Sequence, residues 1–551
     1  MKKLAKFFSL LIVAILFSPT SIASAGEYDE ILTQKIDSIF QKWDNDYSPG
    51  AAVAIMKDGE VIFKKVYGMA NLEYDIPITP SSIFNIASIS KQYTAFCIAL
   101  LAQENKLSLD DDIRKYLSEI PDFGEVITIK NLIHHTSGLR DQGQLMAIIG
   151  RKEGIAIEQD DIIKLVERQK RLNFKPNDRY LYSNTGYTLL AEIVEKVSGK
   201  TLRDYADEII FKPLDMHSTF FYDDYTEIVK NRTYSYSPKD SITYRKSISN
   251  NSYVGASNLY TTIGDHVKWL NNFKNAQVGG KDVIEQMQEV GILNNGDTLN
   301  YAFGLVIGKY NGLKSIGHGG SSAGFRSNSV YYPEKEIGIV IFSNASNDTG
   351  LLGMKLSDML LGNKTALQNE GILKKIDKTN FKDHLGNYIS DEGFHCMIFD
   401  STKLYIKYKY GIGELSPVSE VELTAYNGRE HFRFNKSNPM ILEFQYLNYP
   451  KSILKKYDKP NYTIEELQKF VGSYYNEETE TKYGISLIGE KLQVSHKIYE
   501  TVMLKPLKKD QFSCPNWWMN NIIFQRNING EVIGFEINCD RVLHLFFKKE
   551  S

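Results

Sequence analysis

The sequence predicts an α+β fold: one domain that combines an antiparallel sheet with helices is followed by two small antiparallel β-barrels. Three observations predict these layers. Strand-like runs stand at both ends of residues 27–362, with helical periodicity between them. Residues 363–380 are polar and rich in lysine, which is typical of a linker. Beyond them, short alternating strands occur in two similar copies.

Local patterns place the elements of the first domain. Residues 51–56 and 61–66 are β-rich, and the Asp-Gly pair between them is a strong hairpin signal. Apolar residues at helical spacing predict helices over 88–105 and 189–197. Strands at both ends of a domain with helices between them indicate one shared sheet. We therefore expect strands that are far apart in the chain to pair and complete this sheet. The later strands are expected over 303–307, 327–332 and 337–342.

The C-terminal region contains an internal repeat. Leu385–Tyr388 matches Val471–Tyr474, and Lys403–Ile406 matches Lys491–Val494 in the same order. Two copies are too few for a solenoid, and each is dense in short strands, so two small barrels or sandwiches are expected. The predicted boundaries are a first barrel over 381–449, a linker over 449–463 and a second barrel over 464–551.

Composition excludes several classes of protein. Hydrophobic residues make 42% of the chain and charged residues 24%, which is ordinary for globular proteins. The 65 basic and 67 acidic residues leave no basic excess for nucleic acid. Of the four cysteines, Cys97 lies in an apolar run and is expected to be a buried thiol. Cys514 and Cys539 are candidates for a disulfide that the sequence alone does not decide.

The N-terminus predicts export. Three lysines precede the apolar run 7–17, and Ala23-Ser24-Ala25 supplies small residues for a signal peptidase. We therefore predict a signal peptide over 1–25, cut after Ala25, and a secreted, periplasmic or cell-envelope protein without a stable membrane span. An uncleaved membrane anchor is the alternative, which the shortness of the apolar run disfavours.

Ser88-Ile89-Ser90-Lys91 places a hydroxyl and an amine three residues apart at the start of a predicted helix. Residues at this spacing share a helix face, so the amine can reach the hydroxyl. Burial and the helix dipole favour a neutral lysine that acts as a base. The motif alone is weak: Ser452 and Lys455 match it too, and an ordinary helix N-cap is the alternative for Ser88.

Two further motifs strengthen the interpretation. Tyr182-Ser183-Asn184 brings together a phenol that can relay a proton and an amide that can hold a carbonyl. His318-Gly319-Gly320, directly before Ser321, puts paired glycines on a strand, where they permit close approach of a backbone. The alternatives are a turn with a packed aromatic for the first motif and a bulge or tight turn for the second.

The order S-x-x-K, Y-x-N, H-G-G resembles the penicillin-recognising serine hydrolases, which include class C β-lactamases, DD-peptidases, D-aminopeptidases and related esterases. The likeness extends over about 48–347, and it includes His135-Thr136-Ser137-Gly138-Leu139 and Gly324-Phe325-Arg326-Ser327. The resemblance implies a β-lactamase-like fold for residues 27–362, in which an antiparallel sheet is flanked by helices and accompanied by an all-helical subdomain. The C-terminal repeats resemble the lipocalin-like barrels of D-aminopeptidases.

The resemblance implies a role for each matched residue. Ser88 would be the nucleophile that forms an acyl-enzyme, and Lys91 the base that activates it. Tyr182 would carry the proton to the leaving group, and Asn184 would hold the substrate amide. The backbone N–H groups of Ser88 and Ser321 would form the oxyanion hole.

His318 departs from the pattern, because many β-lactamases carry a lysine at this position. A histidine with an ordinary pKa near ~6.5 is mostly neutral at pH 7, so it would attract a substrate carboxylate less. Arg326 is a candidate replacement cation, with a surface arginine as the alternative. His134 and His135 are adjacent and diverge, and no further ligand completes a site, so neither a metal nor a cofactor is expected.

These observations predict an exported serine hydrolase that cleaves amide bonds of D-amino-acid peptides, as a D-aminopeptidase or a DD-carboxypeptidase. A carboxylesterase or weak β-lactamase is the enzymatic alternative. A penicillin-binding or cell-wall sensor protein whose acyl-enzyme does not turn over is the non-enzymatic one. The expected partner is a small peptide or ester, including cell-wall peptide. Because every catalytic motif precedes residue 363, the barrels are expected to tune substrate choice without supplying catalysis.

Overall fold

A computed structural model describes residues 25–550, apart from 153, 241, 363–377, 392, 402, 409–410, 426–429 and 447–450. The chain forms two compact units, residues 1–42 and 43–551. Within the first unit, helix α1 spans Ala25–Phe40 and a 3₁₀ turn begins at Gln41. The predicted signal peptide, except Ala25, and most of the predicted linker 363–380 lie outside the described residues. No helix in the described part of the chain is long and apolar enough to cross a membrane.

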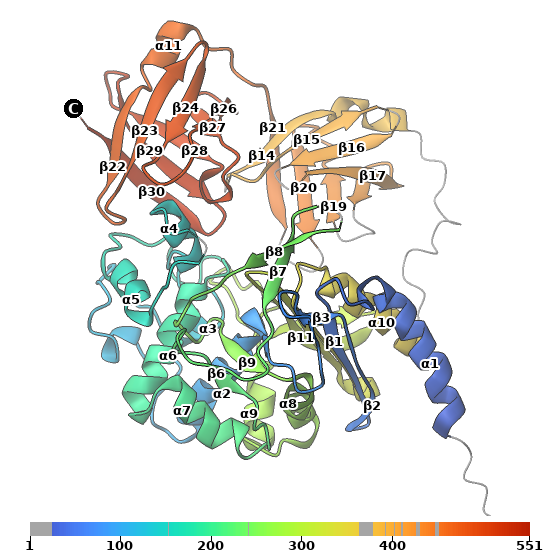
Figure 1. Ribbon diagram of the computed structural model, residues 1–551. Coiled ribbons are helices and arrows are strands. Elements are labelled where there is room, and N and C mark those ends of the chain that lie inside the picture. The colour runs from blue at the N-terminus through green and yellow to red at the C-terminus, as the bar shows by residue number, and fades with distance from the viewer. Residues whose placement is uncertain are drawn as a thin grey trace, which may run out of the picture. The chain divides into compact units, whose positions relative to one another are not determined.

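The central sheet of the first domain joins both ends of that domain (Figure 1). The N-terminal hairpin pairs through β1 with the last strand, β13, so that Ala51 lies opposite Ser343. The prediction of an antiparallel sheet closed by chain-distant strands is confirmed. In spatial order the strands are β10 (Val306–Tyr310), β11 (Leu313–Ser322), β12 (Phe325–Tyr332), β13 (Ile337–Ser343), β1 (Ala51–Lys57) and β2 (Glu60–Tyr67).

Helices cover the two faces of this sheet, as successive residues of β12 show. Asn328 faces helix α10 (Thr349–Leu361), where its amide would lie 2.5 Å from a Cβ at Gly353. The next residue, Ser329, faces helix α8 (Ile263–Asn275) and lies 2.8 Å from Nε2 of His266. Side chains alternate across a strand, so α8 and α10 lie on opposite faces.

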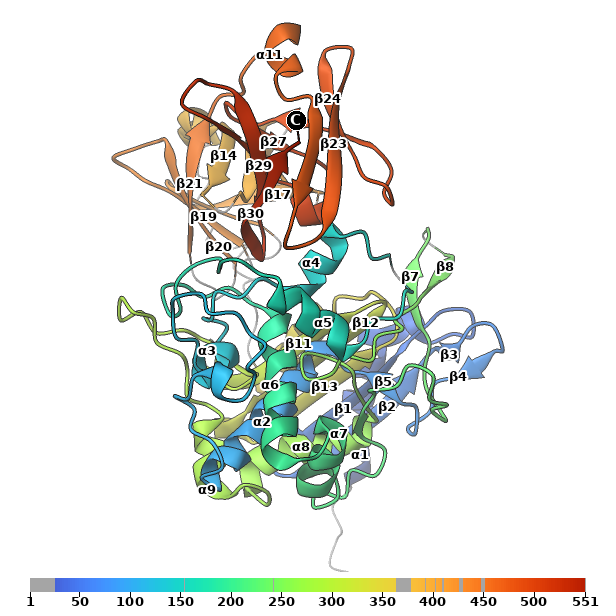
Figure 2. The same ribbon diagram turned by 90° about the vertical axis from the view of Figure 1, so that its left-hand side faces the viewer.

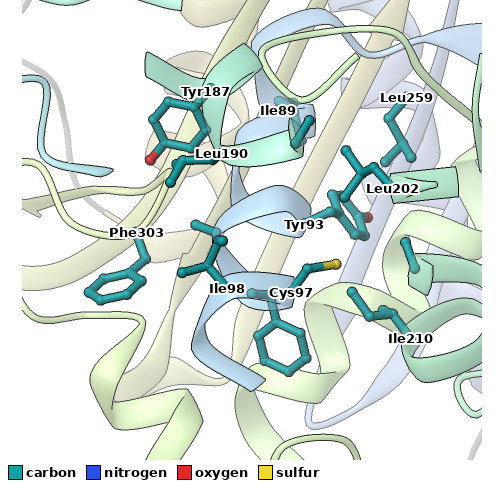
Figure 3. Close-up of a cluster of buried hydrophobic side chains, with 14 of the residues drawn as sticks. Ile89, Tyr93, Cys97, Ile98, Tyr187, Leu190, Leu202, Ile210, Leu259 and Phe303 are labelled. Atoms are coloured by element: carbon teal, nitrogen blue, oxygen red, sulfur yellow. The ribbon is translucent and has the colours of Figure 1, made fainter. Parts of the chain in front are cut away.

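The core of the domain is built around α2 (Ser90–Gln103), which follows the 3₁₀ turn η2 (Ala87–Ile89). Helix α6 (Asn184–Ser198) packs beside it, as the view in Figure 2 shows. Cys97 points into the apolar cluster of Figure 3 and is fully buried, as predicted, and burial raises the pKa of its thiol. A helix buried on every side explains why the apolar pattern of 88–105 runs almost without interruption.

The remaining elements of this domain are short. The helices are η3 (Ile113–Lys115), α3 (Ile129–Ile133), α4 (Gln142–Ile148), α5 (Gln159–Glu167), α7 (Leu202–Ala206), η4 (Asp207–Phe211), α9 (Gly280–Gln286) and η5 (Pro333–Lys335). The strands are β3 (Met69–Asn71), β4 (Ile76–Pro77), β5 (Phe84–Asn85), β6 (Phe220–Phe221), β7 (Ser235–Pro238), β8 (Tyr244–Ser247) and β9 (Leu259–Thr261).

The first C-terminal domain is a closed eight-stranded barrel that follows η7 (Lys378–His384). The predicted boundary at residue 449 is wrong, because β21 pairs with both β14 and β20 and closes the barrel. The second S-x-x-K match, Ser452 to Lys455, lies on this strand instead of a helix. The strands are β14 (Gly386–Ser390), β15 (His395–Asp400), β16 (Leu404–Tyr408), β17 (Gly411–Ser419), β18 (Glu422–Ala425), β19 (Glu430–Phe434), β20 (Ile441–Tyr446) and β21 (Ser452–Tyr457).

The second C-terminal domain is a nine-stranded antiparallel sheet that begins after α11 (Ile464–Gln468) and includes η8 (Trp517–Met519). Its strand order runs from β25 through β22 and β30 to β26, without closure between the two edges. The strands are β22 (Gly472–Asn476), β23 (Thr481–Ile488), β24 (Lys491–Ser495), β25 (Val502–Met503), β26 (Lys505–Pro506), β27 (Gln511–Ser513), β28 (Ile522–Arg526), β29 (Val532–Cys539) and β30 (Val542–Lys549).

The two copies share local structure as well as sequence. Tyr388 in the first strand of the barrel donates its hydroxyl to the carbonyl of His384, at 2.8 Å. Tyr474 in the first strand of the second domain does the same to Phe470, at 2.6 Å. Each bond reaches back four residues and ties the entry segment to the first strand. The matched positions therefore keep one structural role in both copies.

No disulfide joins the four cysteines, all of which lie in the described part of the chain and are buried. The thiol of Cys514 lies 3.4 Å from the carbonyl of Met519. The sulfur of Cys539 lies 3.2 Å from Nε2 of Gln144, in the first domain. The open question of a Cys514–Cys539 bond is thus decided against pairing, since each sulfur has a different neighbour.

Candidate active site

The predicted nucleophile lies in a strained turn. Ala87, directly before Ser88, has a φ of 51°, which L-residues adopt rarely, and Ser88 follows in the 3₁₀ turn that leads into α2. The residue at the N-cap of α2 is Ile89, so Ser88 is not the ordinary N-cap that was the alternative. The turn presents the hydroxyl of Ser88 toward a cavity that it lines.

Lys91 is fully buried and has three neighbours for its amine. Nζ lies 3.2 Å from Oγ of Ser88, 2.9 Å from Oδ1 of Asn184 and 2.7 Å from the carbonyl oxygen of Ala256. A neutral amine has two hydrogens and one lone pair. Because the amide and carbonyl oxygens only accept, they use the two hydrogens, and the lone pair is left for the hydroxyl hydrogen of Ser88.

Electrostatics favour that neutral amine. Burial is the largest influence and holds the pKa of Lys91 well below its ordinary value, and the guanidinium of Arg541 acts in the same direction. The carboxylate of Asp141 acts in the opposite direction and does not offset them. These influences suit the predicted role of Lys91 as a base.

His135 packs against the ring of Tyr182 and binds the backbone of the next residue. The N–H of Ser183 donates to Nδ1 of His135 at 3.1 Å, and the rings of His135 and Tyr182 lie 4.2 Å apart. Nζ of Lys91 is 4.9 Å from the centroid of the Tyr182 ring. Burial holds the pKa of His135 well below its ordinary value, so this histidine is a neutral packing group. No group of metal-binding side chains occurs in the described residues.

Asn184, the first residue of α6, connects Lys91 to a residue that the sequence motifs did not single out. Its Oδ1 accepts from Lys91, and its Nδ2 donates to Oδ2 of Asp141 at 3.0 Å. Asp141 also accepts from the backbone N–H of Asn184 at 2.7 Å and caps α4 by accepting from Gln144. Asp141 stands directly before α4, at the N-cap position that aspartate prefers. This preference is the sequence signal that could have identified Asp141.

Strand β11 lies close against the nucleophile turn because Gly320 has no side chain. A Cβ at this position would lie 2.4 Å from the carbonyl oxygen of Ile86 and 3.1 Å from Cβ of Ala87. Ser327 on β12 donates to the same Ile86 carbonyl at 2.7 Å. Gly319 is exposed and open, and Ser321 follows on the cavity wall. Of the two predicted glycines, one serves packing and the other leaves space at the site.

His318 is held as one neutral tautomer. Its Nδ1 lies 2.5 Å from the carbonyl of Gly319, which can only accept, so Nδ1 carries the hydrogen. Nε2 then accepts from the hydroxyl of Tyr301, at 3.1 Å. Burial, followed by repulsion from Lys91, lowers the pKa of His318 to about 4. This value lies below the unperturbed value of ~6.5, because the half-buried ring lies beside another base, Lys91.

Arg326 lies at the cavity with part of its guanidinium already bound. Nη1 donates to the carbonyls of Ala323, at 2.9 Å, and Phe325, at 2.7 Å, and so supports the turn between β11 and β12. Its side chain is half-buried, and burial lowers its pKa. The structure thus places Arg326 beside the site, where its first role is to hold the turn.

The predicted residues meet in one cavity of about 1000 Å³. A second cavity of about 1190 Å³ shares part of this wall, including Tyr182 and Asn184. Two further wall residues, Trp517 and Arg541, come from the second C-terminal domain. No local motif pointed to them, since they approach the site only through tertiary structure. The predicted residues on the wall of the first cavity are Ser88, Tyr182, Asn184, His318, Gly319, Gly320, Ser321 and Arg326.

A profile of the beta-lactamase family matches residues 36–357, more than half of the chain. The chain belongs to the beta-lactamase family. This family membership, with D-aminopeptidases among its relatives, makes it a serine hydrolase. Penicillin-binding protein 4* of Bacillus subtilis is 26% identical over 414 residues, which cover 70% of this chain and 90% of the relative. A D-aminopeptidase of Brucella anthropi is 23% identical over 523 residues, 91% of this chain and 95% of the relative.

Solved structures agree with a beta-lactamase fold. An octameric penicillin-binding protein homologue from Pyrococcus abyssi has a TM-score of 0.57 and 25% identity, and the match covers 77% of this chain and 99% of that one. The D-amino acid amidase from Ochrobactrum anthropi SV3 complexed with D-phenylalanine has a TM-score of 0.51 and 21% identity, with coverage of 62% and 99%. The predicted resemblance to penicillin-recognising hydrolases is confirmed.

Proposed function

We propose that this protein is an exported serine hydrolase that cleaves amide bonds of D-amino-acid-containing peptides through an acyl-enzyme on Ser88. The observation that carries the proposal is the buried Lys91, whose Nζ lies 3.2 Å from Oγ of Ser88 and whose pKa is held well below its ordinary value by burial. The D-aminopeptidase that aligns with 91% of this chain supports the substrate class. The N-terminal sequence, described above, supports export.

In acylation, Lys91 takes the proton of the Ser88 hydroxyl while Oγ attacks the substrate carbonyl carbon. The developing oxyanion is stabilised by the backbone N–H groups of Ser88 and Ser321. As the tetrahedral intermediate collapses, the C–N bond breaks and Tyr182 delivers to the leaving amine the proton that Lys91 received. Tyr182 suits this relay because its ring lies within 4.9 Å of Nζ.

Deacylation reverses these proton movements. A water molecule gives a proton to the Tyr182–Lys91 pair and attacks the acyl carbon, and the ester bond to Oγ breaks as Ser88 regains its hydrogen. Asn184 contributes by orientation: its Oδ1 fixes the amine of Lys91, and Asp141 in turn fixes the amide of Asn184. One hydrogen on Nδ2 of Asn184 is left for a substrate carbonyl.

A penicillin-binding protein that acylates without turnover is the second candidate function. The relative named penicillin-binding protein 4* aligns over 70% of this chain and supports it. A neutral His318 in place of a permanent cation argues against efficient β-lactam hydrolysis, since a β-lactam carboxylate gains less there. Weak β-lactamase and esterase activities remain within reach of the same acyl-enzyme chemistry.

A substrate screen separates these functions. Purified protein is assayed with D-aminoacyl anilides, D-Ala-D-Ala peptides, short-chain esters and a chromogenic cephalosporin, while intact mass spectrometry follows labelling of Ser88. Turnover of the D-amino-acid substrates supports the proposed function. Stoichiometric labelling by β-lactam without turnover of any substrate supports the penicillin-binding function instead. The S452A variant, which removes the other S-x-x-K serine, serves as the matched control.

A further inference from the structure

A cation from the second C-terminal domain stands beside the catalytic centre. Arg541 forms, with Asp540, the two-residue tip between β29 and β30. Its guanidinium carbon lies 4.7 Å from the centroid of the Tyr182 ring. The side chain lines both cavities and is 42% exposed, so a ligand in either cavity can reach it.

Two buried amide side chains fix the tip. Gln144 donates Nε2 to the carbonyl of Cys539, at 2.9 Å, and accepts the N–H of Arg541, at 2.8 Å. Asn173 donates Nδ2 to the carbonyl of Arg541, at 3.0 Å, and accepts the N–H of Leu543, at 2.8 Å. The backbone around Arg541 is therefore held independently of its side chain. This rigidity suits a group that must meet a ligand in one geometry.

In the cavity that Ser88 lines, the other basic groups are neutral or already bound to the backbone. His318 is neutral at pH 7, and burial favours neutral Lys91. Arg326 donates Nη1 to two backbone carbonyls. Arg541 faces Asp141 at 3.8 Å, beyond hydrogen-bonding distance, and Oδ2 of Asp141 already accepts two bonds from Asn184.

Arg541 keeps its charge in this setting. Burial acts to lower its pKa, but the carboxylate of Asp141 and the phenols of Tyr182 and Tyr180 outweigh it and raise the pKa above the ordinary value. A guanidinium offers several parallel N–H donors, a geometry that matches a carboxylate. A free ammonium group at the same place would be repelled.

We propose that Arg541 binds a carboxylate of the substrate and thereby selects anionic substrates over those whose free amine lies at the same place. This inference rests on the proposed function and names its substrate class: D-amino-acid amides or esters that carry a carboxylate near the scissile bond. Arg541 is then a specificity-determining residue. The second C-terminal domain supplies it to a site whose catalytic residues lie in the beta-lactamase domain.

The first experiment uses two substrates that differ only in charge: N-acetyl-D-alanyl esters of glycolic acid and of glycolamide. In the wild type, kcat/KM for the carboxylate ester is expected to exceed that for the amide ester by about tenfold or more, as a charge-assisted bond provides. The R541Q variant is expected to remove that preference, and R541K to keep part of it. The matched control is R168Q, because Arg168 pairs with Glu480 across the same pair of domains but outside both cavities.

The second experiment needs no turnover. Binding of N-acetyl-D-alanyl-D-alanine and of its C-terminal amide to S88A and to S88A/R541Q is measured by calorimetry. The proposal is supported if S88A binds the carboxylate form about tenfold more tightly than the amide and S88A/R541Q does not. This holds even if the wild type hydrolyses neither ester, because absent hydrolysis would refute only the proposed function. Equal binding of the two peptides to S88A, or a preference that survives R541Q, overturns the proposal.

Discussion

The ion pair between Arg140 and Glu478 allows a stability prediction for the contact between the hydrolase domain and the second C-terminal domain. Arg140 is fully buried and the side chain of Glu478 is 10% exposed. Arg140 also donates to the carbonyls of Leu543 and His544. In E478Q the shape is kept and the anion is lost, so the guanidinium stays buried without its counter-charge. Removing one partner of a buried pair costs about 3–5 kcal/mol, which is the expected loss of unfolding free energy.

The measurement is urea unfolding followed by tryptophan fluorescence, since Trp517 and Trp518 belong to the second C-terminal domain near α4. The matched control is E480Q, which breaks the pair of Glu480 with Arg168, where the side chains are 60% and 37% exposed. An exposed pair contributes only about 0.2–1 kcal/mol. If E478Q loses no more stability than E480Q, the reasoning that a buried charge is left uncompensated is refuted.

Three further predictions concern the catalytic centre. S88A is expected to lower kcat by about a thousandfold or more, and S452A to leave it unchanged; a fluorophosphonate adduct on Ser452 would exclude the assignment. Because the base must be neutral, activity falls at pH values below the pKa of Lys91. R541Q removes a positive charge and so raises that pKa, and we expect the acidic limb of kcat/KM for an uncharged ester to move to higher pH. An unmoved limb would contradict the electrostatic effect of Arg541 on Lys91. His318, with a pKa of about 4, stays neutral from about pH 5.5 to about 8, so KM for an anionic substrate should not change with pH through this histidine in that range. A change of KM with a midpoint near pH 6.5 would contradict the lowered pKa of His318.

The sequence predicted those parts of the molecule that local patterns determine. The hairpin of β1 and β2 follows from a turn whose residues, Asp58 and Gly59, both adopt positive φ. The short spacing of Ser88 and Lys91 along a helix predicted their contact, because three residues bring side chains to one face. The order of the motifs along the chain then predicted the family.

Long-range structure escaped the sequence analysis. The prolines at 450 and 460 predict a linker, although β21 lies between them and closes the barrel by pairing with β14. The pKa of His318 is lowered by burial and by Lys91, and β11 and α2, which carry these two residues, lie far apart in the chain. Arg541 belongs to a hairpin tip whose sequence resembles any exposed turn, and only the fold brings it to Tyr182.

The segment 140–144 explains how a distant domain can affect the catalytic base. Arg140 binds Glu478, and Gln144 binds the backbone of Cys539 and of Arg541 at the β29–β30 tip. Between them, Asp141 accepts from Asn184, which holds the amine of Lys91. Leu145, Met146 and Ile148, which follow, share a hydrophobic cluster with the second C-terminal domain. Because the same short segment supports both the interface and Asn184, loss of that domain would disturb Lys91 through Asp141 as well as through the missing charge of Arg541.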